Sequence, residues 1–305
     1  MIQNRRNFLG TMSSVLSASL VAAQTKVLPS NIQVACNQYN WITFYGREGK
    51  TWFADPDTSL SDFVKTGIKG YEPAFNNADE AKKLAPFLKK YNLQMYSVYV
   101  NSVLHNAAES QKTIENVLAI ADAVKPLGTK ILVSNPSPLK WGSTENKNDE
   151  QLSTQAENLN KLGAELRKRG MILAYHNHDP ELREAAREFH HMMLGTDAQN
   201  VKFCLDAHWC YRGSGNSQVA LFDIVKLYGK RIVEVHLRQS KNGIWTEVFE
   251  DGDIDYRRLV KELKKLDVKP HLVLEQCIEK ESTNTTNAID AHRKGLAYTK
   301  QLFGV

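Results

Sequence analysis

The sequence lacks several signals that identify whole classes of protein. Its four cysteines (Cys36, Cys204, Cys210 and Cys277) show no CxxC spacing and are too few for a disulfide framework, so we predict buried free thiols. No GxGxxG follows the first predicted strand, which removes the main sequence signal for dinucleotide binding. No phosphate-cradling glycine-rich loop is evident either.

Long apolar stretches and interdomain linkers are also missing. After residue 24 no apolar run reaches the roughly 18 residues that span a bilayer, so we expect no membrane span in the mature protein. The composition, 42% hydrophobic and 24% charged, is typical of one large globular domain. The net charge of +5 comes from Lys and Arg that alternate with acids, as in 161–169, which indicates solvated helix faces rather than a nucleic-acid footprint.

The first 24 residues differ from the rest of the chain. Arg5 and Arg6 precede Phe8 and Leu9, a small and apolar run follows, and an alanine-containing segment ends at residue 24. A basic region, a short apolar region and small residues at a cleavage site are typical of an export signal. This segment resembles a twin-arginine signal, which implies export of a folded protein to the periplasm or beyond. We therefore assign residues 1–24 to the signal and 30–305 to the folded domain.

After residue 30, short β-rich runs alternate with helical patterns. The runs lie at 32–36, 70–73, 93–99, 130–134, 171–175, 201–205, 232–236 and 271–275, and helical spacing is clear at 78–90, 110–124, 154–168 and 256–266. Eight strands that alternate with helices predict an α/β fold, a single-domain (β/α)8 TIM barrel. The polar loop 135–150, with two prolines and Trp141, is a candidate lid.

Polar residues follow the later strands of this predicted barrel. The fifth strand leads into His176 and His178, and the sixth, seventh and eighth lead into Asp206, His236 and Glu275. The carboxyl ends of barrel strands surround one mouth, so two imidazoles and two carboxylates can converge on one divalent ion of the Mn, Co, Zn, Fe or Mg type. His208 has the opposite strand parity to Asp206 and ranks below these residues.

Five segments together carry a family resemblance: 174–178 (AYHNH) with Glu181, 205–209 (LDAHW), 235–238 (VHLR), 251–255 (DGDID) and 274–275 (LE). Over nearly the whole mature chain they resemble the sugar phosphate isomerase/epimerase superfamily, the xylose isomerase-like barrels. The resemblance implies that Asp206, His236 and Glu275 are metal ligands and that the fifth strand supplies the remaining one. Many family members have Glu at that position, whereas the matching residue here is His176.

This departure changes the expected proton chemistry. In the epimerases two ligand glutamates on opposite faces of the substrate also move protons, so of that pair only Glu275 remains here. A neutral histidine ligand cannot also act as a base through the same nitrogen. His178 then becomes the candidate general base, with Glu181 as an alternative; a second interpretation of His178 is a group that orients a ligand. Whether His176 or His178 is the ligand depends on the strand register.

Further residues are candidates for sugar binding. Arg238 follows His236 by two positions, so it points to the same mouth and can bind a hydroxyl or a developing enolate oxygen; a structural ion pair is the alternative. Glu72, at the end of the second strand, is a candidate for a sugar hydroxyl. Tyr39, Trp41 and Trp209 are candidate apolar walls, with ordinary packing as the alternative.

The hypothesis that follows is a metal-dependent sugar isomerase or epimerase. The metal polarises a carbonyl while a base removes the adjacent proton through an enediolate-like intermediate. Expulsion of a β-leaving group would instead make a lyase or dehydratase, and the changed fifth-strand ligand and the export signal favour a free or oxidised sugar, such as a keto-glycoside.

Two further alternatives remain open. The apurinic endonuclease branch needs additional metal ligands, but Trp209 stands where a further His is expected, and export argues against a nucleic-acid substrate. A non-catalytic carbohydrate-binding barrel is the second. Homo-oligomers are common in the family, but the sequence shows no interface signature.

Overall fold

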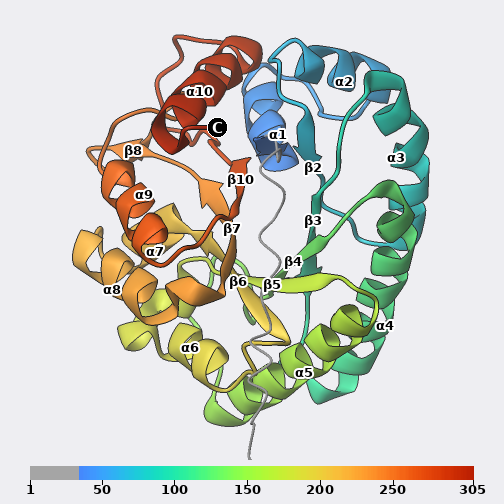
Figure 1. Ribbon diagram of the computed structural model, residues 1–305, viewed down its shortest axis with the longest axis vertical. Coiled ribbons are helices and arrows are strands. Elements are labelled where there is room, and N and C mark those ends of the chain that lie inside the picture. Colours follow the sequence, from blue (N-terminus) through green and yellow to red (C-terminus); the bar gives the residue numbers. More distant parts are fainter. Residues whose placement is uncertain (1–33) are drawn as a thin grey trace, which may run out of the picture.

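The computed structural model describes residues 34–305, so the predicted export signal lies outside the described residues. Within them, a central sheet has the strand order β2-β1-β10-β7-β6-β5-β4-β3, and every neighbouring pair is parallel (Figure 1). The strands are β1 (Ala35–Asn37), β2 (Gly70–Glu72), β3 (Ser97–Ser102), β4 (Ile131–Pro136), β5 (Ile172–His176), β6 (Val201–Asp206), β7 (Ile232–Leu237) and β10 (His271–Leu274). All eight predicted strands are present.

The two ends of this sheet, β2 and β3, are joined by isolated bridges. Gly70 pairs with Gln94 and Ala74 with Tyr99. The backbone nitrogen of Tyr71 donates to the carbonyl of Gln94 at 2.8 Å, and that of Tyr99 donates to the carbonyl of Pro73 at 2.9 Å. The sheet therefore closes, and the predicted TIM barrel is confirmed.

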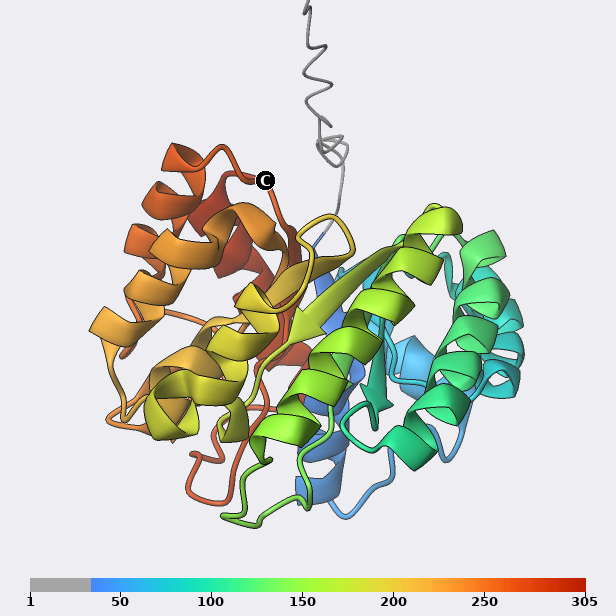
Figure 2. The same ribbon diagram turned by 90° about the horizontal axis from the view of Figure 1, so that it is seen from below.

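Helices cover the outside of the barrel (Figures 1 and 2). They are α1 (Gln38–Arg47), α2 (Pro56–Val64), α3 (Ala78–Tyr91), α4 (Ala107–Val124), α5 (Asp149–Lys168), α6 (Arg183–Leu194), α7 (Ala207–Gly213), α8 (Gln218–Tyr228), α9 (Tyr256–Lys265) and α10 (Ala288–Phe303). A short hairpin, β8 (Ser240–Lys241) and β9 (Ile244–Trp245), follows β7. The four predicted helices are confirmed. α5 begins five residues earlier than the apolar periodicity indicates, because Asn148 and Gln151 form a capping box.

The strands separate two buried layers. The larger apolar core lies between the sheet and the helices, and a small inner cluster consists of Ile131, Val133, Ala174 and Cys204. The remaining inner positions are largely polar and are taken up by the site described below. All four cysteines are buried and free, as predicted.

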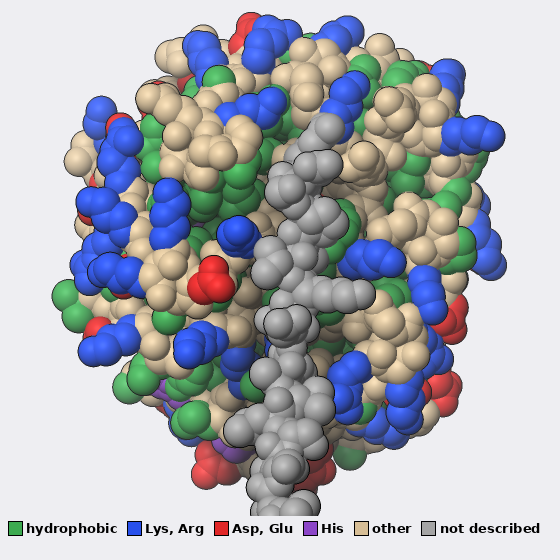
Figure 3. All heavy atoms as spheres, in the orientation of Figure 1, with side chains coloured by type: hydrophobic (Ala, Val, Ile, Leu, Met, Phe, Trp, Pro, Cys, Tyr) green, Lys and Arg blue, Asp and Glu red, His purple; other side chains and the backbone are tan. Residues whose placement is uncertain are grey.

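Two surface features complete the fold. In Figure 2 the green loop that follows β4 projects at the lower end of the molecule, beyond the carboxyl ends of the strands. On the face shown in Figure 3, Lys and Arg side chains are interspersed with acidic and uncharged groups around the periphery. Across residues 34–305, no helix combines the length and apolar character required to cross a membrane.

Candidate metal centre and substrate cleft

Four of the predicted strand-end side chains meet at one point. His176 and Asp206 end β5 and β6, His236 lies in β7, and Glu275 follows β10 directly. One ligand atom from each lies within 4.8 Å of the others, and all four residues are buried. Nε2 of His176 is 3.2 Å from Nδ1 of His236, which is itself 3.1 Å from Oε2 of Glu275. The closed barrel thus brings together residues spread over 100 positions of the sequence.

Asp206 provides a test of whether this set suits a metal. Its Oδ1 accepts a hydrogen bond from the backbone nitrogen of Trp209 at 2.8 Å, but its buried Oδ2 has no hydrogen-bond partner among the described residues. A buried carboxylate oxygen without a partner is costly, and a divalent cation would pair it. The mixed nitrogen and oxygen donors suit Mn, Co, Zn, Fe or Mg. The residues present therefore fit one divalent ion.

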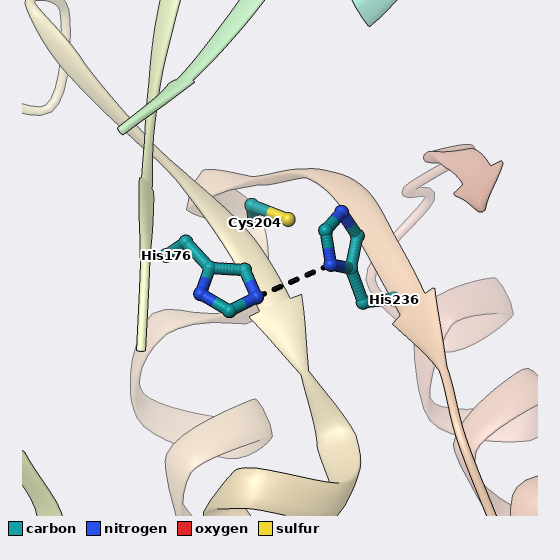
Figure 4. Close-up of side chains that lie close together, drawn as sticks. All are labelled: His176, Cys204 and His236. Carbon is teal, nitrogen blue, oxygen red and sulfur yellow. Dashed lines mark hydrogen bonds between the residues drawn. The ribbon is translucent and has the colours of Figure 1, made fainter. Parts of the chain in front are cut away.

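A second polar layer lies behind His236. Its Nε2 is 3.1 Å from Oε1 of Glu72 and 3.2 Å from Oε1 of Glu234, and the Cys204 thiol lies 3.6 Å from the same Glu234 oxygen. Figure 4 shows the Cys204 sulfur beside the facing imidazoles of His176 and His236. Burial raises the pKa of the Cys204 thiol well above its usual value, so this side chain is neutral. Carboxylates of this kind fix the ring of a histidine, and here they leave Nδ1 of His236 facing His176 and Glu275, where it could bind a divalent ion.

Glu72 ends β2, as predicted, but it does not line the substrate cleft. Its carboxylate is completely buried and accepts hydrogen bonds from Nδ2 of Asn37 at 2.7 Å and from the Ser97 hydroxyl. Burial alone would raise the pKa of Glu72, but His236 holds it low, at about 2. Glu72 therefore contacts His236 from within the barrel instead of binding a sugar hydroxyl in the cleft.

A cleft of about 470 Å³ opens above the four-residue cluster. Among the predicted residues, five line it: Tyr39, His178, Trp209, Arg238 and Glu275. Residues that the sequence analysis did not assign to substrate binding also line it, including Asn37, Tyr99, Asn101, Trp141 and Trp245. Trp141 had been singled out only as part of a candidate lid. Strand-end position is a usable signal for Asn37, but Trp245 belongs to the β8–β9 hairpin, which no pattern predicted.

Trp41 lies away from the cleft, contrary to the prediction of an apolar wall. It is completely buried and stacks on Trp52 and His292, with ring centroids 4.9 and 5.0 Å away. Helical geometry explains the difference from Tyr39, because the two positions lie on different faces of the first turns of α1. The packing alternative holds for Trp41.

His178 faces the cleft, and its ring orientation indicates its chemistry. Its ring centroid lies 4.7 Å from that of His176 and 5.1 Å from that of Trp141. Nδ1 of His178 is 2.9 Å from Nδ2 of Asn135, an amide donor. A neutral ring that accepts at Nδ1 carries its proton at Nε2. With Asn135 as the donor in this contact, the neutral His178 ring presents Nε2–H as a hydrogen-bond donor, and its role as the general base stays a prediction.

Glu181, the alternative base, does not line the cleft. Its carboxylate is buried and accepts hydrogen bonds from the backbone nitrogen of His178 at 2.9 Å and from Nδ2 of Asn135 at 3.4 Å. Burial raises the pKa of Glu181 to about 8, so a proton on this carboxyl group is retained at neutral pH. Glu181 holds the turn after β5, which positions His178.

Arg238 makes the ion pair that was the alternative prediction, and it also lines the cleft. Its Nη2 lies 2.8 Å from Oε2 of Glu275, and its Nε donates to the Glu275 carbonyl at 3.0 Å. Its guanidinium also lies 4.4 Å from the centroid of the Trp245 ring. Burial favours the protonated form of Glu275, but Arg238 and His236 outweigh it and hold the pKa of this carboxyl well below its usual range. The cleft therefore contains an ionised carboxylate at its floor.

Comparisons with known proteins agree with this architecture. Residues 60–302 match the family described as xylose isomerase-like TIM barrel. The chain belongs to this family. Its sequence is 26% identical over 273 residues to inosose dehydratase of Clostridium botulinum (strain Alaska E43 / Type E3), covering 80% of this chain and 89% of that one. The resemblance predicted from the strand-end motifs is thereby confirmed.

Two solved structures have similar folds at low sequence identity. L-ribulose 3-epimerase matches this xylose isomerase-like barrel with a TM-score of 0.67 and 13% identity, covering 89% of this chain and 94% of that one. The IOLI protein with a binding zinc atom matches with a TM-score of 0.64 and 14% identity, covering 89% and 98%.

Proposed function

We propose that this xylose isomerase-like barrel is a metal-dependent enzyme that removes a proton next to the carbonyl of a sugar or keto-sugar. One divalent ion, held by His176, Asp206, His236 and Glu275, is part of the proposal. The observation that carries it is the convergence of these four donors in one buried cluster, in which Oδ2 of Asp206 makes no hydrogen bond to the described residues. Similarity to a zinc-containing barrel and to a sugar epimerase supports it.

The cleft residues divide the chemistry between them. A divalent ion bound here would act as a Lewis acid on a substrate oxygen. Glu275, the ionised carboxylate that lines the cleft, is the candidate base for the adjacent proton, and Nε2–H of His178 is placed to donate to a substrate oxygen. Arg238 orients Glu275 through its 2.8 Å contact. Trp209 and Trp245 line the cleft as apolar walls that limit access of water.

A lyase is the second candidate, favoured by the replacement of the fifth-strand glutamate. An epimerase of this family moves protons with carboxylates on both faces of the substrate, but here His176 takes the place of one. One base, Glu275, suits the removal of a proton, and Nε2–H of the neutral His178 ring suits a hydrogen bond to the oxygen of a β-leaving group. The 26% identity to an inosose dehydratase agrees with this reaction type.

Export is a separate part of the proposal and is supported by residues 1–24 alone, with their paired arginines. Cell fractionation of the full chain and of an Arg5→Lys, Arg6→Lys variant tests it. We expect wild type in the exported fraction and the variant retained; equal distribution of both proteins would contradict export by this route.

Metal content tests the function first. Elemental analysis of the purified protein should find about one ion per chain, and His176→Ala, Asp206→Ala, His236→Ala or Glu275→Ala should remove it without loss of the circular dichroism of the fold. The loaded enzyme is then incubated with keto-sugars and glycosides. By mass spectrometry and NMR, a product of unchanged mass indicates an isomerase or epimerase, and a product that has lost a leaving group indicates a lyase. A wild type that binds metal but converts none of them favours the carbohydrate-binding alternative.

A further inference from the structure

A second cavity, of about 410 Å³, adjoins the substrate cleft. We call it the annex. The two share three lining residues, Gln38, Ile42 and Ala74, so they lie next to each other. Both volumes fall within the range of about 300 to 1,000 Å³ that is usual for small-molecule sites. The shared residues come from the start of α1 and from the segment after β2.

Aromatic rings form the walls of the annex. Trp52, Phe53, Tyr71, Phe75 and Phe87 all line it. The rings of Phe53 and Tyr71 are nearly parallel, with an interplanar angle of 3° and centroids 6.2 Å apart. Flat, apolar surfaces of this kind bind aromatic or other apolar groups, with about 0.5 to 1.5 kcal/mol per ring pair beyond the buried area.

The charged groups at the annex do not select for a charged ligand. Glu80 and Lys83, both on α3, are of opposite sign. The Glu80 carboxylate already accepts hydrogen bonds from the backbone nitrogen of Asn76 at 2.7 Å and from the side chain of Asn77 at 3.3 Å. The annex therefore suits an uncharged group.

Phe53 is held in a backbone conformation that favours glycine, with φ at 63°. Its backbone nitrogen donates to the Ser59 hydroxyl at 3.0 Å. A bulky residue in this region is strained by about 1 to 3 kcal/mol, and such strain is concentrated at ligand sites. Glycine would fit this backbone conformation better, so the aromatic side chain of Phe53 indicates a role for the ring itself.

Gln38 stands where the cleft meets the annex. Trp52 Nε1 donates to the Tyr71 hydroxyl at 3.3 Å, and that hydroxyl donates to Oε1 of Gln38, also at 3.3 Å. This chain fixes the amide, and Nε2 of Gln38 makes no hydrogen bond to other described residues. A donor is thus available at the junction for an oxygen that links two parts of a ligand.

We propose that the annex is a subsite for an uncharged aromatic aglycone, attached to a sugar that lies in the substrate cleft. The inference rests on the proposed function, because it names the substrate class as aryl glycosides. The sugar part lies over Glu275 and His178. The aromatic part lies against Phe53 and Tyr71, and the glycosidic oxygen faces Nε2 of Gln38.

The test uses 4-fluorophenol, observed by ¹⁹F NMR, with the full domain. Phe53→Gly removes one wall of the annex and also relieves the left-handed backbone, so the fold is retained. We expect the dissociation constant of 4-fluorophenol to rise about threefold to tenfold in this variant. Trp141→Ala is the matched control, since it removes an aromatic ring that lines the cleft and not the annex. Binding of 4-fluorophenol should not change in this control.

The outcomes separate the annex from the metal chemistry. Glu275→Gln impairs the proposed metal site but should leave 4-fluorophenol binding unchanged. The annex can therefore be confirmed even if the proposed metal-dependent function is wrong. No binding to wild type, or equal weakening in Phe53→Gly and Trp141→Ala, would overturn the annex. Phe53-dependent binding of methyl β-D-glucopyranoside in place of 4-fluorophenol would make the annex a second sugar site and overturn the aromatic assignment.

Discussion

The Glu234 carboxylate lies 3.2 Å from Nε2 of His236, two residues further along β7. Both side chains point into the barrel, as strand parity requires. This contact turns Nδ1 of His236 toward Glu275, at 3.1 Å, and toward His176, at 3.2 Å. The orientation of the metal-facing nitrogen is therefore set from beneath the site, by a residue that does not touch the substrate cleft.

Removal of this carboxylate should weaken metal binding. For Glu234→Leu we expect the zinc affinity to fall about tenfold to a hundredfold, because His236 loses a group that fixes its ring. Competition with a chelating dye measures the affinity. Glu157→Gln, an exposed change on α5, is the control and should have no effect. Unchanged affinity in Glu234→Leu would show that Glu72 alone suffices to orient His236.

Arg238 should contribute most to the free energy of unfolding when the protein holds no metal. It lies 2.8 Å from Glu275 and 3.9 Å from Asp206, and both carboxylates are buried. Arg238→Met leaves them without this cation and should lower the free energy of unfolding by about 3 kcal/mol in the presence of EDTA. Zinc should recover part of this loss. Urea unfolding measures the free energy of unfolding in EDTA and in zinc. An equal loss in the two conditions would contradict the idea that Arg238 and the metal ion neutralise the same carboxylates.

Arg293→Met provides the matched control for that experiment. Arg293 pairs with Asp290 at 2.6 Å on the exposed face of α10. Exposed pairs contribute about 0.2 to 1 kcal/mol, so the change should be small in either condition.

Acid sensitivity should depend on Glu247. This carboxylate accepts hydrogen bonds from the hydroxyls of Thr283 and Thr285, both at 2.7 Å, and pairs with Arg47 at 2.8 Å. Burial would raise the pKa of Glu247, but these hydrogen bonds lower it from 4.5 to about 2. A lowered pKa stabilises the folded state above pH 4.5, and this contribution is lost as the pH falls from 4.5 toward 2.

In Glu247→Gln, the free energy of unfolding at pH 7 should fall by about 2 kcal/mol, and the wild-type and variant curves should converge as the pH approaches about 2. Urea unfolding across the pH range measures this difference. If wild type and variant differed by the same free energy of unfolding at every pH, the hydrogen bonds of Glu247 would stabilise the fold and its negative charge would not.

Gly70 should be intolerant of a side chain. A Cβ atom at Gly70 would lie 2.7 Å from Cβ of Ala35 on the neighbouring strand β1. We expect Gly70→Ala to lower the free energy of unfolding by about 2 kcal/mol, because the two strands must separate. Gly46→Ala is the control, since no atom lies within 4 Å of its added Cβ and helix α1 should be stabilised slightly. Thermal unfolding of both variants checks the contrast.

Much of the site could be predicted, because its residues lie at strand ends that can be recognised in the sequence. His176, Asp206, His236 and Glu275 each lie at or next to the carboxyl end of a buried strand, and a parallel barrel places all such ends at one mouth. Glu72 obeys the same rule of position, yet it lies a layer deeper, because the strands of a barrel are staggered. The position of a residue at a strand end therefore predicts that its side chain faces the barrel interior. It does not predict how deep in the barrel that side chain lies.

The sequence by itself determined the eight barrel strands, four of the helices, the barrel and the candidate metal ligands, since periodicity and strand parity are properties of neighbouring positions. Only the tertiary structure decided which ring of α1 reaches the cleft, that Asn135 contacts Nδ1 of His178, and that Glu234 contacts His236. It also placed Trp245 beside Arg238 and opened the annex behind Gln38 and Ala74. These features depend on distances between distant segments, which are fixed only when the strands close into the barrel.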